Sequence, residues 1–290
     1  MDNRRYDFSP IIRREPIRWP NNARVAIWIG PNIEYFHVDL HGVQYQPVPF
    51  LPDVMNYGWR DYGLRVGIWR IMEVLDKHGM RASVLLNSDV CAHYPAVIEE
   101  GKKRNWEFLG HGITNSVKLT GMTEDEERAT IRKVIDDITA GVGTPPKGWL
   151  GPSLVESFMT PDLLAEEGIE YVCDWCCDDQ PFPMRVRANR LISVPYSMEV
   201  NDIPAFLAMK MSPSDFGRMI VDWFDRLYAE GADSGRVMCI ALHPFVTGVP
   251  HRIKYLDEAL EYICGHEQVW RTTSGEIAEW YYKHYYSPPA

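Results

Sequence analysis

The sequence lacks a basic face. Its 30 Lys and Arg residues are outnumbered by 40 Asp and Glu residues, which gives a formal net charge of −10, and no stripe of positive charge marks any segment. Proteins that bind DNA or RNA carry clustered positive charge that faces the phosphate backbone. The charge balance therefore argues against a nucleic-acid partner and against an anionic membrane surface, and it suits a small or neutral substrate.

Long apolar runs and a cysteine-dense framework are also missing, and the closely spaced Cys173, Cys176 and Cys177 lack the second pair that a four-ligand zinc site needs. No stretch reaches the roughly 18 consecutive apolar residues of a membrane-spanning helix. Residues 1–20 carry five arginines with no apolar run between them, unlike a signal peptide. Six cysteines in 290 residues are too few for a disulfide scaffold. We therefore expect a cytoplasmic protein that has no contact with membranes.

Linkers, repeats and low-complexity segments are absent too, so the sequence predicts one domain over residues 1–290, with 1–22 as an N-terminal extension that packs on it. Short apolar runs alternate with segments of helical periodicity, which predicts a mostly parallel sheet that closes into a barrel. The Pro-rich stretch 44–53 reads as a long surface loop. Strands are expected at 24–31, 82–87, 106–110, 148–151, 170–174, 191–195, 236–242 and 269–272, and helices at 65–78, 94–103, 123–139, 161–167, 213–229, 253–264 and 275–284.

Polar side chains follow several of the expected strands directly. The first strand ends in Asn32-Ile33-Glu34, the third leads into His111, and the last long strand ends in His243. Because the C-terminal ends of parallel strands share one edge of the sheet, residues at these ends collect at one place. The pattern predicts a convergent site.

These strand ends belong to a longer series of motifs. The series comprises NIE at 32–34, RDYGLRVG at 60–67, EFLGHG at 107–112, LHP at 242–244, GVPHR at 248–252 and EIA at 276–278. In this order the motifs resemble the polysaccharide deacetylase (carbohydrate esterase) superfamily, in particular its branch of allantoinases and cyclic-imide hydrolases. The resemblance covers most of the chain. It implies a distorted (β/α)7-type barrel, like that of NodB-homology domains, and a hydrolase of carbon–nitrogen bonds other than peptide bonds.

The resemblance also implies a metal site, from which this sequence departs. In the deacetylases one Asp is the general base, and a second Asp and two His hold a divalent metal. Here Glu34 takes the base position, Tyr35 falls on the metal carboxylate, and Asn115 replaces the second His. Two interpretations stay open. Either Glu34, His111 and Asn115 hold Zn or Mn, or no metal is used, in which case Glu34 or His111 activates water and His243 protonates the leaving nitrogen.

Further candidates for substrate binding come from the same strand ends and motifs. Arg65, at a helix start, is expected to clamp a carbonyl or carboxylate, and the loop after Trp149 is expected to offer backbone N–H groups to an oxyanion. Structural alternatives are an ion pair between Glu34 and Arg65, a satisfied structural role for His243, and a solvated turn at 178–179. The full substrate-binding set is Asn32, Arg65, Trp149, Pro152, Ser153, Asp178, Asp179 and Glu199.

The leading hypothesis is a hydrolase that opens the ring of a small cyclic amide, imide or ureide, with a small molecule as its partner. One alternative is an N-deacetylase of polysaccharide or peptidoglycan amino sugars. Another is a catalytically inactive, deacetylase-like binding protein, because Tyr35 and Asn115 stand where metal ligands are expected. The Pro-rich loop at 44–53 and the aromatic segment 280–286, together with the oligomeric habit of the branch, predict a homo-oligomer.

Overall fold

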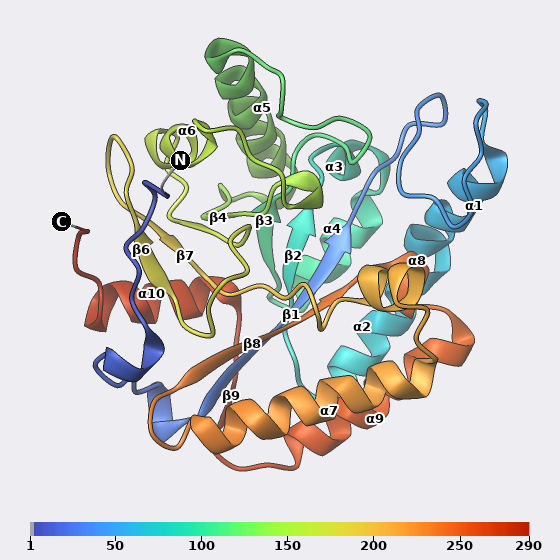
Figure 1. The fold of residues 1–290 in the computed structure, drawn as a ribbon. Helices are drawn as coiled ribbons and strands as arrows, with labels where there is room; N and C mark the ends of the chain where they lie inside the picture. The colour runs from blue at the N-terminus through green and yellow to red at the C-terminus, as the bar shows by residue number, and fades with distance from the viewer. Residues whose placement is uncertain (1–2, 290) are drawn as a thin grey trace.

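Seven parallel strands form the centre of the fold within residues 3–289, which are the residues that the computed structural model describes (Figure 1). A short strand, β6 (Phe182–Met184), pairs antiparallel with β7, and β9 (Val269–Arg271) pairs parallel with β1. Across the sheet, the parallel strands follow in the order β7 (Leu191–Ser193), β5 (Tyr171–Val172), β4 (Gly148–Trp149), β3 (Glu107–Gly110), β2 (Ser83–Leu86), β1 (Val25–Ile33) and β8 (Arg236–Leu242).

The two ends of this row meet through a short contact rather than a full ladder. After β7 the chain runs toward β8, where Asn201 forms a parallel bridge with Ala241. The backbone N–H of Ala241 donates to the carbonyl of Val200 at 3.0 Å. A curled sheet that closes so loosely is a distorted barrel of seven strands, which confirms the predicted fold class.

Side-chain alternation along the strands separates two apolar layers. In β1, Ile27 and Ile29 face the surrounding helices, whereas Ala26 and Trp28 belong to a second cluster with Leu85 and other residues of neighbouring strands. This second cluster fills the barrel interior, and both faces of β1 are buried, as is usual for parallel strands.

Helices cover the outside of the sheet (Figure 1). Within the part of the chain that is described, no helix combines the length and apolar character needed to cross a bilayer. Short π-helical segments span Gly63–Gly67 and Pro204–Ala208. The helices are α1 (Val54–Tyr62), α2 (Ile68–Lys77), α3 (Asp89–His93), α4 (Pro95–Lys103), α5 (Glu124–Val142), α6 (Thr160–Glu166), α7 (Pro213–Glu230), α8 (Pro244–Thr247), α9 (Pro250–Cys264) and α10 (Ser274–His284).

Most expected elements are present, and the differences have local causes. The helix expected at 65–78 corresponds to α2, which begins at Ile68, and it is preceded by α1, a helix that was not expected, where the Asp53 side chain accepts a hydrogen bond from the backbone N–H of Asn56. The strands expected at 148–151 and 170–174 pair over two residues each, because the chain turns away soon after Trp149 and Val172. Helices α3 and α8 and strand β6 are too short to produce a periodic pattern.

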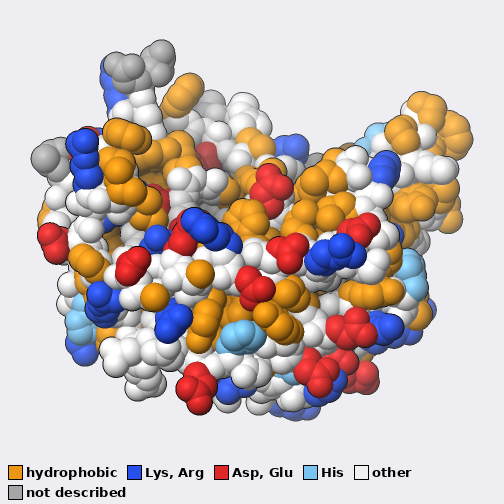
Figure 2. Space-filling model, turned by 60° about the horizontal axis from the view of Figure 1, so that its bottom comes forward, with side chains coloured by type: hydrophobic (Ala, Val, Ile, Leu, Met, Phe, Trp, Pro, Cys, Tyr) orange, Lys and Arg blue, Asp and Glu red, His pale blue; other side chains and the backbone are white. Residues whose placement is uncertain are grey.

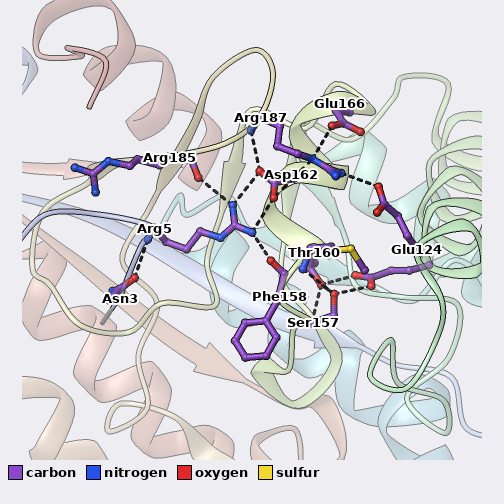
Figure 3. Close-up of polar contacts among 12 residues, drawn as sticks. Asn3, Arg5, Glu124, Ser157, Phe158, Thr160, Asp162, Glu166, Arg185 and Arg187 are labelled. Carbon is purple, nitrogen blue, oxygen red and sulfur yellow. Dashed lines mark hydrogen bonds and ion pairs between the residues drawn. The ribbon is translucent and has the colours of Figure 1, made fainter. Parts of the chain in front are cut away.

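The N-terminal segment, described from residue 3, lies against α6 and the loops beside it. The Arg5 guanidinium binds Asp162 with two hydrogen bonds of 2.9 and 2.8 Å, and it also donates to the carbonyls of Phe158 and Arg185. Figure 3 shows Arg5 reaching between Asp162 and Phe158, with Arg187 on the other side of Asp162. The bidentate pair ties the segment to the end of the barrel that carries the loop after β4.

Candidate active site

Glu34, His111 and His243 meet at the C-terminal edge of the sheet. Glu34 follows β1, His111 follows β3 and His243 follows β8. Glu34 Oε1 lies 3.5 Å from His111 Nε2 and 3.8 Å from His243 Nε2. All three side chains are buried and line one cavity of about 510 Å³. The structure therefore brings the three residues together, and their catalytic roles remain a prediction.

The hydrogen bond of His111 fixes which of its ring nitrogens is basic. His111 Nδ1 lies 2.6 Å from the carbonyl oxygen of Leu150, which can only accept, so Nδ1 carries the hydrogen. In the neutral imidazole with hydrogen on Nδ1, Nε2 is the acceptor atom, and this buried atom makes no hydrogen bond within the described protein. It faces Glu34 Oε1, another acceptor. A group with two donor hydrogens, such as water, can bridge the two atoms from the cavity side.

His243 is also held through Nδ1, but by a carboxylate. Its Nδ1 donates to Asp202 Oδ1 at 2.7 Å, and its backbone N–H donates to Asp202 Oδ2 at 2.7 Å. Thr247 Oγ1 also donates to Asp202, at 2.6 Å. Burial by itself lowers the pKa of His243, but the carboxylates of Asp202 and Glu34 outweigh burial, so the pKa is raised. The arrangement favours an imidazolium that can give a proton.

Replacing Asp202 with Asn tests this arrangement. Activity that needs protonated His243 is lost as the pH rises through the raised pKa of that residue. A neutral amide in place of the carboxylate would no longer stabilise the positive charge, so we expect the alkaline limb of the pH–kcat profile to move toward lower pH. Thr247→Val removes only one bond to the same carboxylate and serves as control, with a limb that stays in place. An unmoved limb in Asp202→Asn would mean that another group carries the proton.

Two asparagines connect the strand-end loops around Glu34. Asn115 Nδ2 donates to Glu34 Oε1, and the backbone N–H of Asn115 donates to the carbonyl of Tyr35 at 3.1 Å. Asn87, fully buried after β2, accepts from the backbone N–H of Tyr35 at 2.9 Å. Its Nδ2 donates to the carbonyl of His111 and to Asn115 Oδ1, the latter at 3.3 Å. Asn87 was missed as a site residue, because only the fold shows what it contacts, whereas Asp202 was expected only at the rim of the pocket.

The donor set does not fit the three-ligand metal site that the resemblance implies. The ring of Tyr35 stacks on His93, with centroids 4.4 Å apart, and does not line the cavity. Asn115 turns its N–H toward Glu34, and its oxygen accepts from Asn87. Among residues 3–289, no group of three or more His, Cys, Asp and Glu side chains is arranged to hold a metal ion. A site built from Glu34, His111 and Asn115 is therefore not supported by these contacts.

Arg60, rather than the expected Arg65, is the arginine beside the site. The Arg65 side chain is 72% exposed and lies 3.7 Å from Asp61, so it forms a surface ion pair away from the cavity. Arg60, five residues before Arg65, is buried, and it donates to the carbonyl of Val43 at 2.7 Å. Burial lowers the pKa of Arg60, against the opposing effect of the Asp53 and Glu34 carboxylates. The expectation that Arg65 clamps substrate is corrected.

The other expected substrate-binding residues divide between the cavity and its surroundings. Asn32 lines the cavity and donates to the hydroxyl of Tyr196 at 3.0 Å, and Ser153 also lines it. Trp149 lies fully buried in the core, where its indole ring packs against Gly110. Pro152 packs instead against Gly112, which has a positive φ of 69°. For Trp149 and Pro152 the expected role in the cavity is therefore corrected.

The acidic candidates also lie elsewhere. Asp178 forms an ion pair with Arg14, whose guanidinium nitrogen is 2.6 Å away, because the N-terminal segment covers this loop. Asp179 and Glu199 line a different surface hollow. None of the three lines the cavity, so their expected contact with substrate there is corrected. Asn201, expected at the rim, does line the cavity. The cavity also has residues that sequence reasoning missed, from the loop before α1, the loop after β4 and the segment after β7: Val43, Gln44, Leu154, Tyr196, Met198, Ile203, Pro204, Leu207 and Ala208.

Comparisons with known proteins agree with this architecture. Residues 59–172 match the family described as polysaccharide deacetylase. A Schizosaccharomyces pombe protein assigned as a polysaccharide deacetylase is 27% identical over 92% of this chain and 93% of its own length. The crystal structure of the allantoinase PuuE is 26% identical, has a TM-score of 0.87 and covers 95% of this chain and 96% of its own. The peptidoglycan deacetylase of Helicobacter pylori is 23% identical over 79% of this chain and 87% of its own length.

Proposed function

We propose, since the chain belongs to the polysaccharide deacetylase superfamily, that it opens the ring of a small cyclic amide, imide or ureide by hydrolysis. The family hydrolyses carbon–nitrogen bonds other than peptide bonds. The observation that carries the finer proposal is the position of Glu34 Oε1 between the Nε2 atoms of His111 and His243. The similarity to an allantoinase over nearly the whole chain also supports it.

The size and lining of the cavity support a small substrate. A volume of about 510 Å³ lies within the range of small-molecule pockets, roughly 300–1,000 Å³. Apolar side chains from the segment after β7, such as Ile203 and Leu207, form much of the wall, and a few polar groups converge on one side. This combination suits a compact ring with polar edges.

In the proposed reaction, a water in the cavity that bridges Glu34 and His111 donates a hydrogen to each and adds through oxygen to the ring carbonyl carbon. One of these two residues takes the proton. The tetrahedral intermediate then collapses, the carbon–nitrogen bond breaks, and the imidazolium of His243 gives its proton to the leaving nitrogen. The products are a carboxyl group and a free amide or amine on one chain. Where Glu34 is the base, it returns that proton to neutral His243 through a bridging water, since Glu34 Oε1 and His243 Nε2 lie 3.8 Å apart.

Assays with and without chelator test this proposal. Purified protein is expected to hydrolyse at least one of succinimide, dihydrouracil and allantoin, and EDTA is expected to leave the rate unchanged, because the ligands of the family metal are replaced at Tyr35 and Asn115. Acetate release from N-acetylglucosamine oligosaccharides, with no ring opening, would instead favour the N-deacetylase. Inactivity on every substrate would favour the inactive binding protein. A cytoplasmic setting remains part of the proposal.

A further inference from the structure

A chain of hydrogen bonds leads from His111 through the backbone to a carboxyl group outside the cavity. His111 Nδ1 donates to the carbonyl oxygen of Leu150, 2.6 Å away. The N–H of the same peptide group belongs to Gly151, and it donates to Asp174 Oδ1 at 2.7 Å. A single planar peptide therefore links the imidazole of His111 to Asp174. Asp174 does not line the cavity, and the proposed reaction does not use it.

Backbone contacts hold this peptide in a fixed place. The N–H of Leu150 donates to the carbonyl of Gly110 on β3 at 3.0 Å, and Asp174 comes from the segment that follows β5. A Cβ on Gly151 would lie 2.9 Å from Asp174 Oδ1 and 2.7 Å from the carbonyl oxygen of Val155. The absence of a side chain at Gly151 therefore lets the carboxyl group reach the peptide N–H.

A second carboxyl group, that of Glu156, decides when Asp174 is charged. Asp174 Oδ2 and Glu156 Oε1 are buried and make no hydrogen bond within the described residues. Burial raises the pKa of Asp174 to about 7, against the opposing effect of the N–H of Gly151. Burial and then the charge of Asp174 raise the pKa of Glu156 well above its ordinary value. Glu156 therefore keeps its proton when the pH rises through the pKa of Asp174, and Asp174 becomes the charged member of the pair.

The charge on Asp174 acts on His111 as a local group. On the face that Figure 2 shows, acidic and basic side chains are interspersed, with no large area of either sign. Surface charges of mixed sign largely cancel at a distance, and salt screens them further. A buried carboxylate that is two hydrogen bonds away from the imidazole is screened much less.

We propose that Asp174 is a positioning residue for His111 and acts on it through the Leu150–Gly151 peptide. A carboxylate that accepts from the peptide N–H pushes electron density toward the peptide oxygen, because hydrogen bonds in a chain polarise one another. The oxygen then holds the Nδ1 hydrogen of His111 more firmly, and Nε2 becomes a better acceptor for the bridging water. The consequence for catalysis rests on the proposed function, whereas the link between the two side chains does not.

Proton and nitrogen NMR of the histidine side chains tests the link without a substrate. Asp174→Asn keeps an oxygen acceptor for the peptide N–H but loses the charge, so the Nδ1–H signal of His111 is expected to move upfield at about pH 8. Glu156→Gln makes the same chemical change on the neutral member of the pair and should leave this signal in place. The Nδ1–H of His243, which binds Asp202, is an internal reference. Loss of a signal in His111→Gln assigns it among the nine histidines.

Steady-state kinetics on the ring substrate measure the consequence for catalysis. Cooperative strengthening adds roughly 10–30% to a hydrogen bond, so its loss in Asp174→Asn is expected to lower kcat by about 2- to 20-fold at about pH 8. KM should change little, because Asp174 does not line the cavity. Glu156→Gln should keep both wild-type values.

An unmoved His111 signal in folded Asp174→Asn overturns the proposal, and so does an equal upfield shift in Glu156→Gln. If Asp174→Asn does not fold, Gly151→Ala takes its place. The added Cβ, 2.9 Å from Asp174 Oδ1, should weaken the same hydrogen bond and move the signal upfield, and an unmoved signal there also overturns the proposal. A shifted signal in a protein that opens no ring supports the link and contradicts only the proposed function. Ring opening by the wild type, with no shift in the variants, does the reverse.

Discussion

Replacing Glu34 with Gln is expected to lower kcat by about 10²- to 10⁴-fold, with a much smaller change in KM. The substitution keeps the shape of the side chain but removes the charge that lies between the two imidazoles, 3.5 Å from His111 and 3.8 Å from His243. An amide can neither take a proton from water nor return one to His243. Steady-state kinetics on the ring substrate that the wild type opens would measure the effect.

The stability of the same variant separates a catalytic from a structural role. Glu34 Oε2 is buried and has no hydrogen-bond partner in the protein, which is costly for a carboxylate. A neutral amide should therefore be tolerated, and we expect the midpoint of thermal unfolding to stay level or rise. Glu199→Gln, at an exposed carboxylate outside the cavity, is the control and should change neither quantity. Full activity in Glu34→Gln, or a large loss of stability, would make Glu34 a structural residue.

The strand-end rule located the centre of the site because it depends only on sheet topology. Glu34, His111 and His243 are 77 and 132 positions apart along the chain, and parallel strands bring their ends together regardless of that separation. The same rule misplaced Asp178 and Glu199. Loops leaving a strand end can turn away from the centre, and here the N-terminal segment captures Asp178 through Arg14. No local pattern in the sequence encodes that contact.

A shift in helical phase explains why the sequence pointed to Arg65 and the structure places Arg60 beside the site. The periodicity predicted a helix start at residue 65, which would place Arg65 at a helix entrance. The structure has α1 from residue 54 and a π-helical segment at Gly63–Gly67, which shifts the helical phase between α1 and α2. Arg60 is therefore buried beside the site, and Arg65 faces solvent. An irregular turn of this kind has no reliable signature in a single sequence.

At Gly67 even a small substitution should lower the stability of the protein. Gly67 lies in a helical segment, where Ala would ordinarily be favoured over Gly by roughly 0.5–1 kcal/mol. A Cβ at this position would lie 2.1 Å from the carbonyl oxygen of Pro244 and 2.8 Å from its carbonyl carbon. Backbone atoms cannot rotate away as a side chain can. We expect Gly67→Ala to lower the free energy of unfolding by about 1–3 kcal/mol.

Gly58→Ala provides the matched control on the same helical region. Gly58 lies within α1, and a Cβ there would meet no atom within 4 Å. The free energy of unfolding of this variant should rise by about 0.5–1 kcal/mol, because Ala restricts the unfolded chain more than Gly does. Urea unfolding of both variants would measure the two free energies. Opposite signs are expected, although the chemical change is identical.

The effect at Gly67 should extend to the active site, because Pro244 directly follows His243. A shift of the Pro244 backbone that makes room for the methyl group would displace the imidazole relative to Glu34 Oε1, now 3.8 Å away. Folded Gly67→Ala should therefore show a lower kcat at temperatures well below its unfolding transition, whereas Gly58→Ala should keep the wild-type value. Equal stability and equal kcat in the two variants would mean that the close packing of this helical segment on Pro244 does not position His243.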